Sequence, residues 1–171
     1  MSILDDIANS KDKINNSDFA RKTLPQILES LPFVTHGRAH RTFDILFTYT
    51  THHSLLRITH AGLSHGMWSD PKYAPEGARV LSHKDVDTAI SSPGRVAIVS
   101  ESHGAGTGVE GYICFYGEGP SPEPWVGSIH WCNPYLGSNW IVVHTAKGYG
   151  ARWTNVKGNN AQVWVDLYPT S

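Results

Sequence analysis

The feature that most constrains the fold is a change of hydrophobic period at Thr42. The β-forming residues Phe43, Ile45, Phe47 and Tyr49 alternate with Asp44, Leu46 and Thr48, a period of two that is typical of a strand. Runs rich in β-forming residues predict further strands at 55–59, 95–100, 111–116, 125–132, 140–145 and 161–167. In the last run Val163 and Val165 alternate with Trp164 and Asp166, so we expect one core face and one partly exposed face.

Glycine and proline separate these runs at short intervals. The turn signals are Ala61-Gly62, His65-Gly66, Asp70-Pro71, 75–77, Pro93-Gly94, 104–108 and 117–124. No helix-length periodic segment lies between the expected strands, which disfavours a sheet built from βαβ units. The pattern therefore predicts a mainly all-β fold, a single antiparallel β-sandwich over residues 35–171.

The first 34 residues have a different, helical pattern. Ser2 with Asp5 and Thr23 with Gln26 are capping signatures, and each precedes an apolar stripe at helical spacing. The stripes comprise Ile3, Leu4 and Ile7, then Leu24, Ile27 and Leu28. Two interpretations stay open for this amphipathic segment: it docks on the sheet, or it detaches and inserts into a bilayer.

Composition excludes several classes of protein. A formal net charge of −1 disfavours a nucleic-acid partner, since such proteins normally carry a basic excess. Two cysteines, Cys114 and Cys132, lack metal or redox spacing, and free thiols are the simpler expectation. The start has no apolar signal-peptide region, and no stretch approaches the ~18 apolar residues of a spanning helix. We expect a soluble protein, cytoplasmic or secreted without a classical signal peptide, with a target membrane as an option.

The most distinctive block runs from Gly106 to Trp140, GTGVEGYICFYGEGPSPEPWVGSIHWCNPYLGSNW. It resembles the central block of the aegerolysins, small β-sandwich cytolysins of fungi and bacteria, and is similar to that of the actinoporins, sea-anemone pore formers. The matching positions are Gly106-Thr107-Gly108, Glu110-Gly111, Trp131, Cys132, Pro134, Tyr135, Gly137, Ser138, Asn139 and Trp140. The resemblance implies a cytolysin that binds a membrane lipid.

Aromatic residues near turns are the candidate contacts for a ligand. Indole and phenol rings bury apolar area while keeping one polar atom in water, which suits a lipid headgroup or a sugar. We expect the binding residues to be Trp131, Pro134, Tyr135, Ser138, Asn139, Trp140, Tyr149 and Trp153. For Trp131 a place in the core is an equal alternative. Lys147 and Arg152 lie nearby, where cations could meet phosphate.

Catalytic and metal-binding patterns are weak in this sequence. It has no GxSxG elbow and no HExxH, and its glycine-rich run at 104–108 precedes a strand rather than a helix. Six of the ten histidines crowd one third of the chain, but their spacing indicates surface or turn positions rather than a defined site. We therefore expect neither a metal, a cofactor nor an enzyme.

Two hypotheses about function remain. The first is a cytolysin-like protein that binds a membrane lipid, such as one with a sphingolipid or phosphocholine headgroup, and forms a homo-oligomeric pore. Its inserting element would be the N-terminal segment. The alternative is a lectin-like β-sandwich that binds a glycan through Tyr135, Asn139 and Trp140 without entering a membrane.

Overall fold

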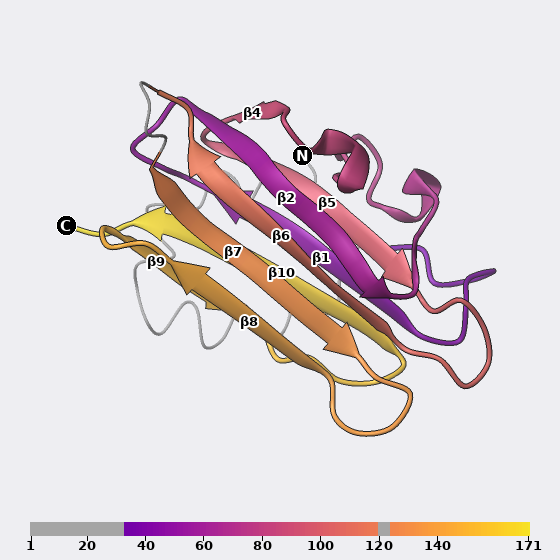
Figure 1. Ribbon diagram of the computed structural model, residues 1–171. Coiled ribbons are helices and arrows are strands. Elements are labelled where there is room, and N and C mark those ends of the chain that lie inside the picture. Colours follow the sequence, from indigo (N-terminus) through magenta and orange to yellow (C-terminus); the bar gives the residue numbers. More distant parts are fainter. Residues whose placement is uncertain (1–32, 120–123) are drawn as a thin grey trace.

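The computed structural model describes residues 33–119 and 124–171, and strands dominate them (Figure 1). The elements in chain order are β1 (Thr42–Tyr49), β2 (Leu55–His65), β3 (Met67–Trp68), the 3-10 helices η1 (Pro71–Tyr73) and η2 (His83–Asp85), β4 (Ala89–Ser91), β5 (Gly94–Glu101), β6 (Val109–Gly117), β7 (Trp125–Asn133), β8 (Trp140–Thr145), β9 (Tyr149–Trp153) and β10 (Asn160–Pro169). The structure does not describe residues 1–32. The apolar residues of the predicted helical segment therefore lie outside the described part of the chain: Ile3, Leu4, Ile7, Leu24, Ile27 and Leu28.

The strands form two five-stranded sheets. The first sheet has the order β3-β5-β1-β10-β9, and the second sheet has the order β4-β2-β6-β7-β8. Their facing sides enclose the main core, which includes Phe47, Phe115 and Trp131. The all-β sandwich predicted from the sequence is confirmed.

One strand pair departs from the predicted antiparallel arrangement. β1 runs parallel to β10, with Phe43 opposite Ala161 and Tyr49 opposite Leu167, while every other paired strand in the two sheets is antiparallel. The parallel pair is possible because the chain visits all other strands between β1 and β10, which supplies the long connection that parallel pairing needs.

The outer face of the first sheet is also buried, which corrects the expectation of a partly exposed face on residues 161–167. Trp164 packs in a smaller core with Phe33, Leu46 and Val99. Asp166 accepts a hydrogen bond from Thr48 Oγ1 at 2.8 Å and pairs with Arg152. Because these polar groups satisfy one another, the polar half of the alternation can be buried.

Two other expectations about strands were wrong in detail. The predicted turn at Ala61-Gly62 lies inside β2, which is irregular between Ile58 and His60 and again between Leu63 and His65. Bulges of this kind let a strand bend without ending. The short edge strand β9 was not predicted, since its sequence YGARW lacks an apolar–polar alternation.

Candidate functional site

The β7–β8 loop, residues 134–139, projects from one end of the sandwich (Figure 1). It follows Asn133, which is fully buried. The Asn133 side-chain amide donates to the carbonyl oxygens of Thr42 at 2.9 Å and of Asn159 at 2.8 Å. One side chain therefore ties the base of the loop to the starts of β1 and β10.

Arg41 extends this anchor to the loop itself. Its guanidinium donates to Asn133 Oδ1 at 3.1 Å and to the carbonyl oxygen of Tyr135 at 2.8 Å. The guanidinium carbon also lies 5.5 Å from the centre of the Tyr135 ring, within the range of a cation–π contact. Among the described residues no carboxylate pairs with Arg41, and its Nε is buried without a hydrogen-bond partner. Arg41 thus brings a positive charge to the loop, and no carboxylate in the described part of the chain neutralises it.

The tip of the loop is apolar and exposed. Leu136 has 82% of its surface in solvent, and Tyr135 beside it has 47%. Asn139 donates to the carbonyl oxygen of Gly158 at 2.7 Å, which joins this loop to the turn before β10. We call Arg41, the β7–β8 loop and residues 157–159 the loop end of the sandwich.

The loop end contains four of the eight residues predicted to bind a ligand. They are Pro134, Tyr135, Ser138 and Asn139, and Trp140 follows at once as the first residue of β8. Trp140 lies on β8, the edge strand of the second sheet, where it pairs with Cys132 of β7 and is 41% exposed. These five residues form one continuous surface segment.

Trp131 does not belong to this surface. It is completely buried, its indole N–H donates to Ser100 Oγ at 3.1 Å, and its ring packs against Phe43 and Trp68. Its place in the sequence beside the loop made it a candidate, but the alternation of β7 turns residue 131 towards the core. Of the two alternatives stated for Trp131, the structure supports the core position and not the ligand contact.

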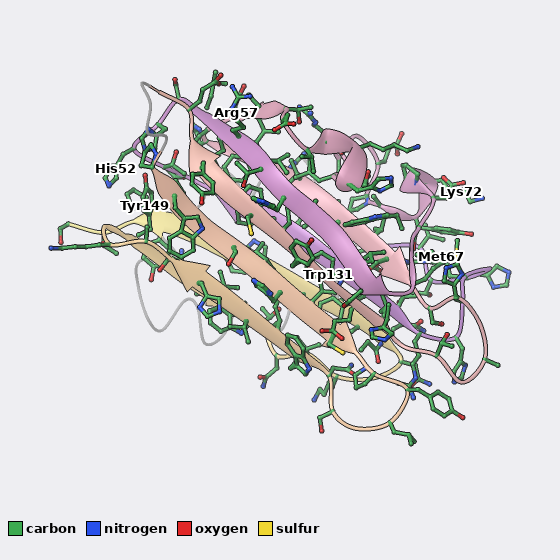
Figure 2. The ribbon with its side chains drawn as sticks, in the orientation of Figure 1. His52, Arg57, Met67, Lys72, Trp131 and Tyr149 are labelled. Carbon is green, nitrogen blue, oxygen red and sulfur yellow. The ribbon has the colours of Figure 1, made fainter. Side chains whose placement is uncertain are left out.

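Tyr149 and Trp153 are on β9, away from the loop end. Tyr149 pairs with Pro169, and its ring centre lies 5.2 Å from that of His52. Tyr149 and His52 therefore lie at the end of the sandwich opposite to the loop end (Figure 2). Trp153 is exposed, but it faces Val165 in the middle of β10. The structure does not bring these two residues together with the predicted loop residues.

The predicted cations also differ in their surroundings. Arg152 donates to Asp166 Oδ2 at 2.8 Å, and its guanidinium carbon lies 5.2 Å from the Tyr168 ring centre. Its main contacts are therefore structural. Lys147 is exposed in the turn between β8 and β9, which is also at the end opposite to the loop end.

Sequence reasoning missed Leu136, Asn133 and Arg41. The sequence does indicate an exposed position for Leu136, because it lies between Tyr135 and Gly137 in a turn and turns lie on the surface. Arg41 had none, because the Tyr135 carbonyl that it binds is 94 positions away.

Two further findings concern metals and membranes. Within residues 33–119 and 124–171, no group of three or more His, Cys, Asp or Glu side chains is arranged to hold a metal ion. None of the helices in these ranges is long and apolar enough to span a bilayer. Cys114 and Cys132 are free thiols, as predicted.

Comparison with solved structures confirms the architecture. The protein named in "Crystal structure of RahU protein in complex with TRIS molecule" superposes with a TM-score of 0.62 at 15% identity, over 77% of this chain and 97% of that chain. IP-1A from Alcaligenes faecalis superposes with a TM-score of 0.56 at 19% identity, over 78% of this chain and 95% of that chain.

Comparison of sequences identifies the family. No curated protein matches the chain. The sequence model of the family described as Aegerolysin matches residues 40–168, which include both sheets and the loop end. The chain belongs to the aegerolysin family.

Proposed function

We propose that this protein binds a membrane lipid through its loop end, as a cytolysin-like protein of the aegerolysin family. The observation that carries the proposal is the exposed Leu136 at the tip of a loop whose base holds Arg41, a cation that no carboxylate of residues 33–119 and 124–171 pairs with. If the loop enters a lipid surface tip first, the apolar tip reaches the acyl chains while the cation at its base lies at the level of the phosphate groups.

Each of the three side chains at the loop end has a physical role in this proposal. Burying Leu136 among acyl chains favours binding by about 1.5–3 kcal/mol. Tyr135 is amphipathic and suits the depth of the headgroups. The guanidinium of Arg41 keeps N–H donors beyond those used for Asn133 and Tyr135, and these can bind a phosphate oxygen. The proposed ligand is thus a phosphate-bearing lipid, such as one with a sphingolipid or phosphocholine headgroup.

The same contacts favour a lipid over a glycan. A sugar site needs free polar groups beside the aromatic ring, but the Asn139 amide already donates to Gly158. The most exposed side chain of the loop is Leu136, which has no polar atom to offer a sugar hydroxyl. Binding of lipid needs no catalytic step, so the proposal assigns no enzymatic activity to the protein.

Pore formation is the second part of the proposal. We assign oligomerisation on the membrane to the whole protein and insertion to the amphipathic pattern of Ile3, Leu4, Ile7, Leu24, Ile27 and Leu28. This part rests on the sequence pattern and on family membership.

Sedimentation with vesicles of sphingomyelin or phosphatidylcholine tests lipid binding. Leu136→Ser should weaken binding by about tenfold or more, since it removes most of the burial energy given above. Leu55→Ser is the matched control, because Leu55 is also partly exposed but lies at the opposite end. Arg41→Gln should weaken binding as well, because it removes the charge that would meet phosphate.

Unchanged binding by Leu136→Ser, or an equal loss in Leu55→Ser, would contradict the assignment to the loop end. Inhibition of binding by free sugars, with no sedimentation on any lipid mixture, would instead support the lectin alternative.

A further inference from the structure

The outward face of the second sheet carries two histidines that the proposed function does not use. Strands β6, β7 and β8 lie side by side in this sheet (Figure 1). Ser128 on β7 faces Cys114 on β6 and His144 on β8, and His130 faces Tyr112 on β6. Because side chains two residues apart on a strand share a face, His130 and His144 extend to the same side of the sheet.

The two imidazole rings approach each other closely. Their centres are 5.8 Å apart and their planes are inclined by 86°. Ser128 pairs directly with His144 and lies two residues before His130, so the two histidines are diagonal neighbours on adjacent strands. Neither ring makes a hydrogen bond within the part of the chain that the structure describes, so their nitrogen atoms are available to a ligand.

The surroundings of one member of the pair, His130, disfavour its charged form. Burial lowers the pKa of His130, and the neighbouring His144 lowers it further. The other titratable groups around His130 are Tyr112, which stacks on its ring, and the diagonal neighbours Cys114 and Glu110. Glu110 lies 3.5 Å from His65 rather than against the pair. Neutral imidazole is the form that binds metals.

We propose that His130 and His144 together bind one divalent transition-metal ion of the Cu²⁺ or Zn²⁺ class. A metal bound by two imidazole nitrogens at about 2.0–2.1 Å each holds the ring centres about 5 Å apart, so a small rotation of the side chains suffices. Since no third His, Cys, Asp or Glu of the described residues completes the group, solvent or an added chelator fills the remaining positions. Imidazole ligands suit both ions.

Calorimetric titration of the full chain with Cu²⁺–nitrilotriacetate tests this site most sharply. Nitrilotriacetate leaves few coordination positions of Cu²⁺ open. A pair of histidines that fills two of these positions should therefore bind the complex more tightly than a single histidine elsewhere on the surface. The wild type should bind one equivalent, and binding should weaken as the pH falls and the imidazoles take up protons. Zn²⁺ alone should raise the Tm, because it binds only the folded pair.

His144→Ala should weaken the binding by about tenfold or more, and His130→Gln should do the same. His144 is exposed on an edge strand, so its replacement should leave the fold intact. His60→Ala is the matched control, because His60 is on the same sheet but is paired with Cys114 rather than with β7 or β8. This control should bind like the wild type.

Absence of binding in the wild type at millimolar chelate would overturn the proposal, and so would unchanged affinity in both variants of the pair. If His144→Ala changes the circular dichroism spectrum, His144→Gln replaces it in the comparison. The proposed metal site does not depend on lipid binding. Vesicle sedimentation should therefore be the same for His144→Ala and the wild type.

Discussion

At the scale of single residues, two tryptophans nine positions apart have opposite roles. Trp131 is buried and hydrogen-bonded to Ser100, whereas Trp140 lies on an edge strand with much of its ring in solvent. The sequence separated them only in part: it gave a core position as an equal alternative for Trp131, but both lie beside the same loop and both stayed candidates for ligand contact. Their roles depend on which face of the sheet each one meets, and this is set by strand register across the whole sandwich.

Replacing each of these tryptophans by alanine should show the difference. Trp131→Ala should lower the free energy of unfolding by about 3–5 kcal/mol, because it leaves a cavity in the core. Trp140→Ala should lower it by less than about 1 kcal/mol. Urea denaturation measures both values, and equal losses would contradict the burial described for Trp131.

A second prediction concerns the buried carboxylate of Asp44. Arg38 donates to both of its oxygens, at 2.6 Å and 2.8 Å, yet burial raises the pKa of Asp44 to about 6. A carboxyl whose pKa is raised on folding stabilises the folded state most when protonated. This contribution is therefore present below pH ~4 and is lost as the pH rises through about 6.

Urea denaturation of the wild type and Asp44→Asn at several pH values measures this contribution. The stability of the wild type relative to the variant should fall as the pH rises from 4 to 7, because only the wild type has this titrating group. A difference that is constant with pH, or that grows in favour of the wild type, would contradict the raised pKa.

At the scale of elements, the sequence predicted best the strands with clear alternation. β1, β5, β6, β7 and β8 are each close to their expected bounds. It predicted poorly where a distant side chain decides the conformation. Gly62 was read as a turn, but it lies in β2 under the ring of Tyr112, where an added Cβ would come within 2.9 Å of the Tyr112 hydroxyl.

The position of the β7–β8 loop depends on a similar close approach at Gly108. A Cβ at this residue would lie 2.7 Å from the carbonyl oxygen of Asn133 and 2.9 Å from the Cα of Pro134. Gly108→Ala should therefore displace the start of the loop and weaken vesicle binding several-fold. Gly104→Ala is the control, because nothing lies within 4 Å of its added Cβ.

Vesicle sedimentation compares these two glycine variants with the wild type. Equal binding by all three would mean that the conformation of the loop does not matter for lipid. A loss in Gly104→Ala alone would place the contact in the turn before β6 instead.

At the scale of the whole molecule, five of the predicted site residues meet on one surface because they are continuous in sequence. Tyr149 and Trp153 were grouped with them on the same ground, since they follow only a few positions later. Strand β8 carries the chain from the loop end to the opposite end, and the turn after it leads into β9 of the other sheet, so β9 begins at that opposite end. Nearness in sequence stops predicting nearness in space once a strand has carried the chain across the sandwich.

The N-terminal segment gives a prediction for the complete protein. Deletion of residues 1–31 should abolish the release of a dye from vesicles while leaving sedimentation with them intact, because binding is assigned to the loop end and insertion to this segment. Dye release by the truncated chain at the rate of the wild type would show that insertion uses another element.

The most direct test of lipid contact at the loop end is a fluorescent label on Leu136→Cys. Burial raises the pKa of Cys114, and it raises that of Cys132 to about 11 with Glu110 adding to the effect, so both stay as unreactive thiols at neutral pH. Ser54→Cys carries the label at the opposite, exposed end as a control. On adding sphingomyelin vesicles, the emission at position 136 should shift to the blue while that at position 54 stays unchanged. A shift at position 54 alone, or at neither position while the protein sediments with the vesicles, would contradict lipid binding through the loop end.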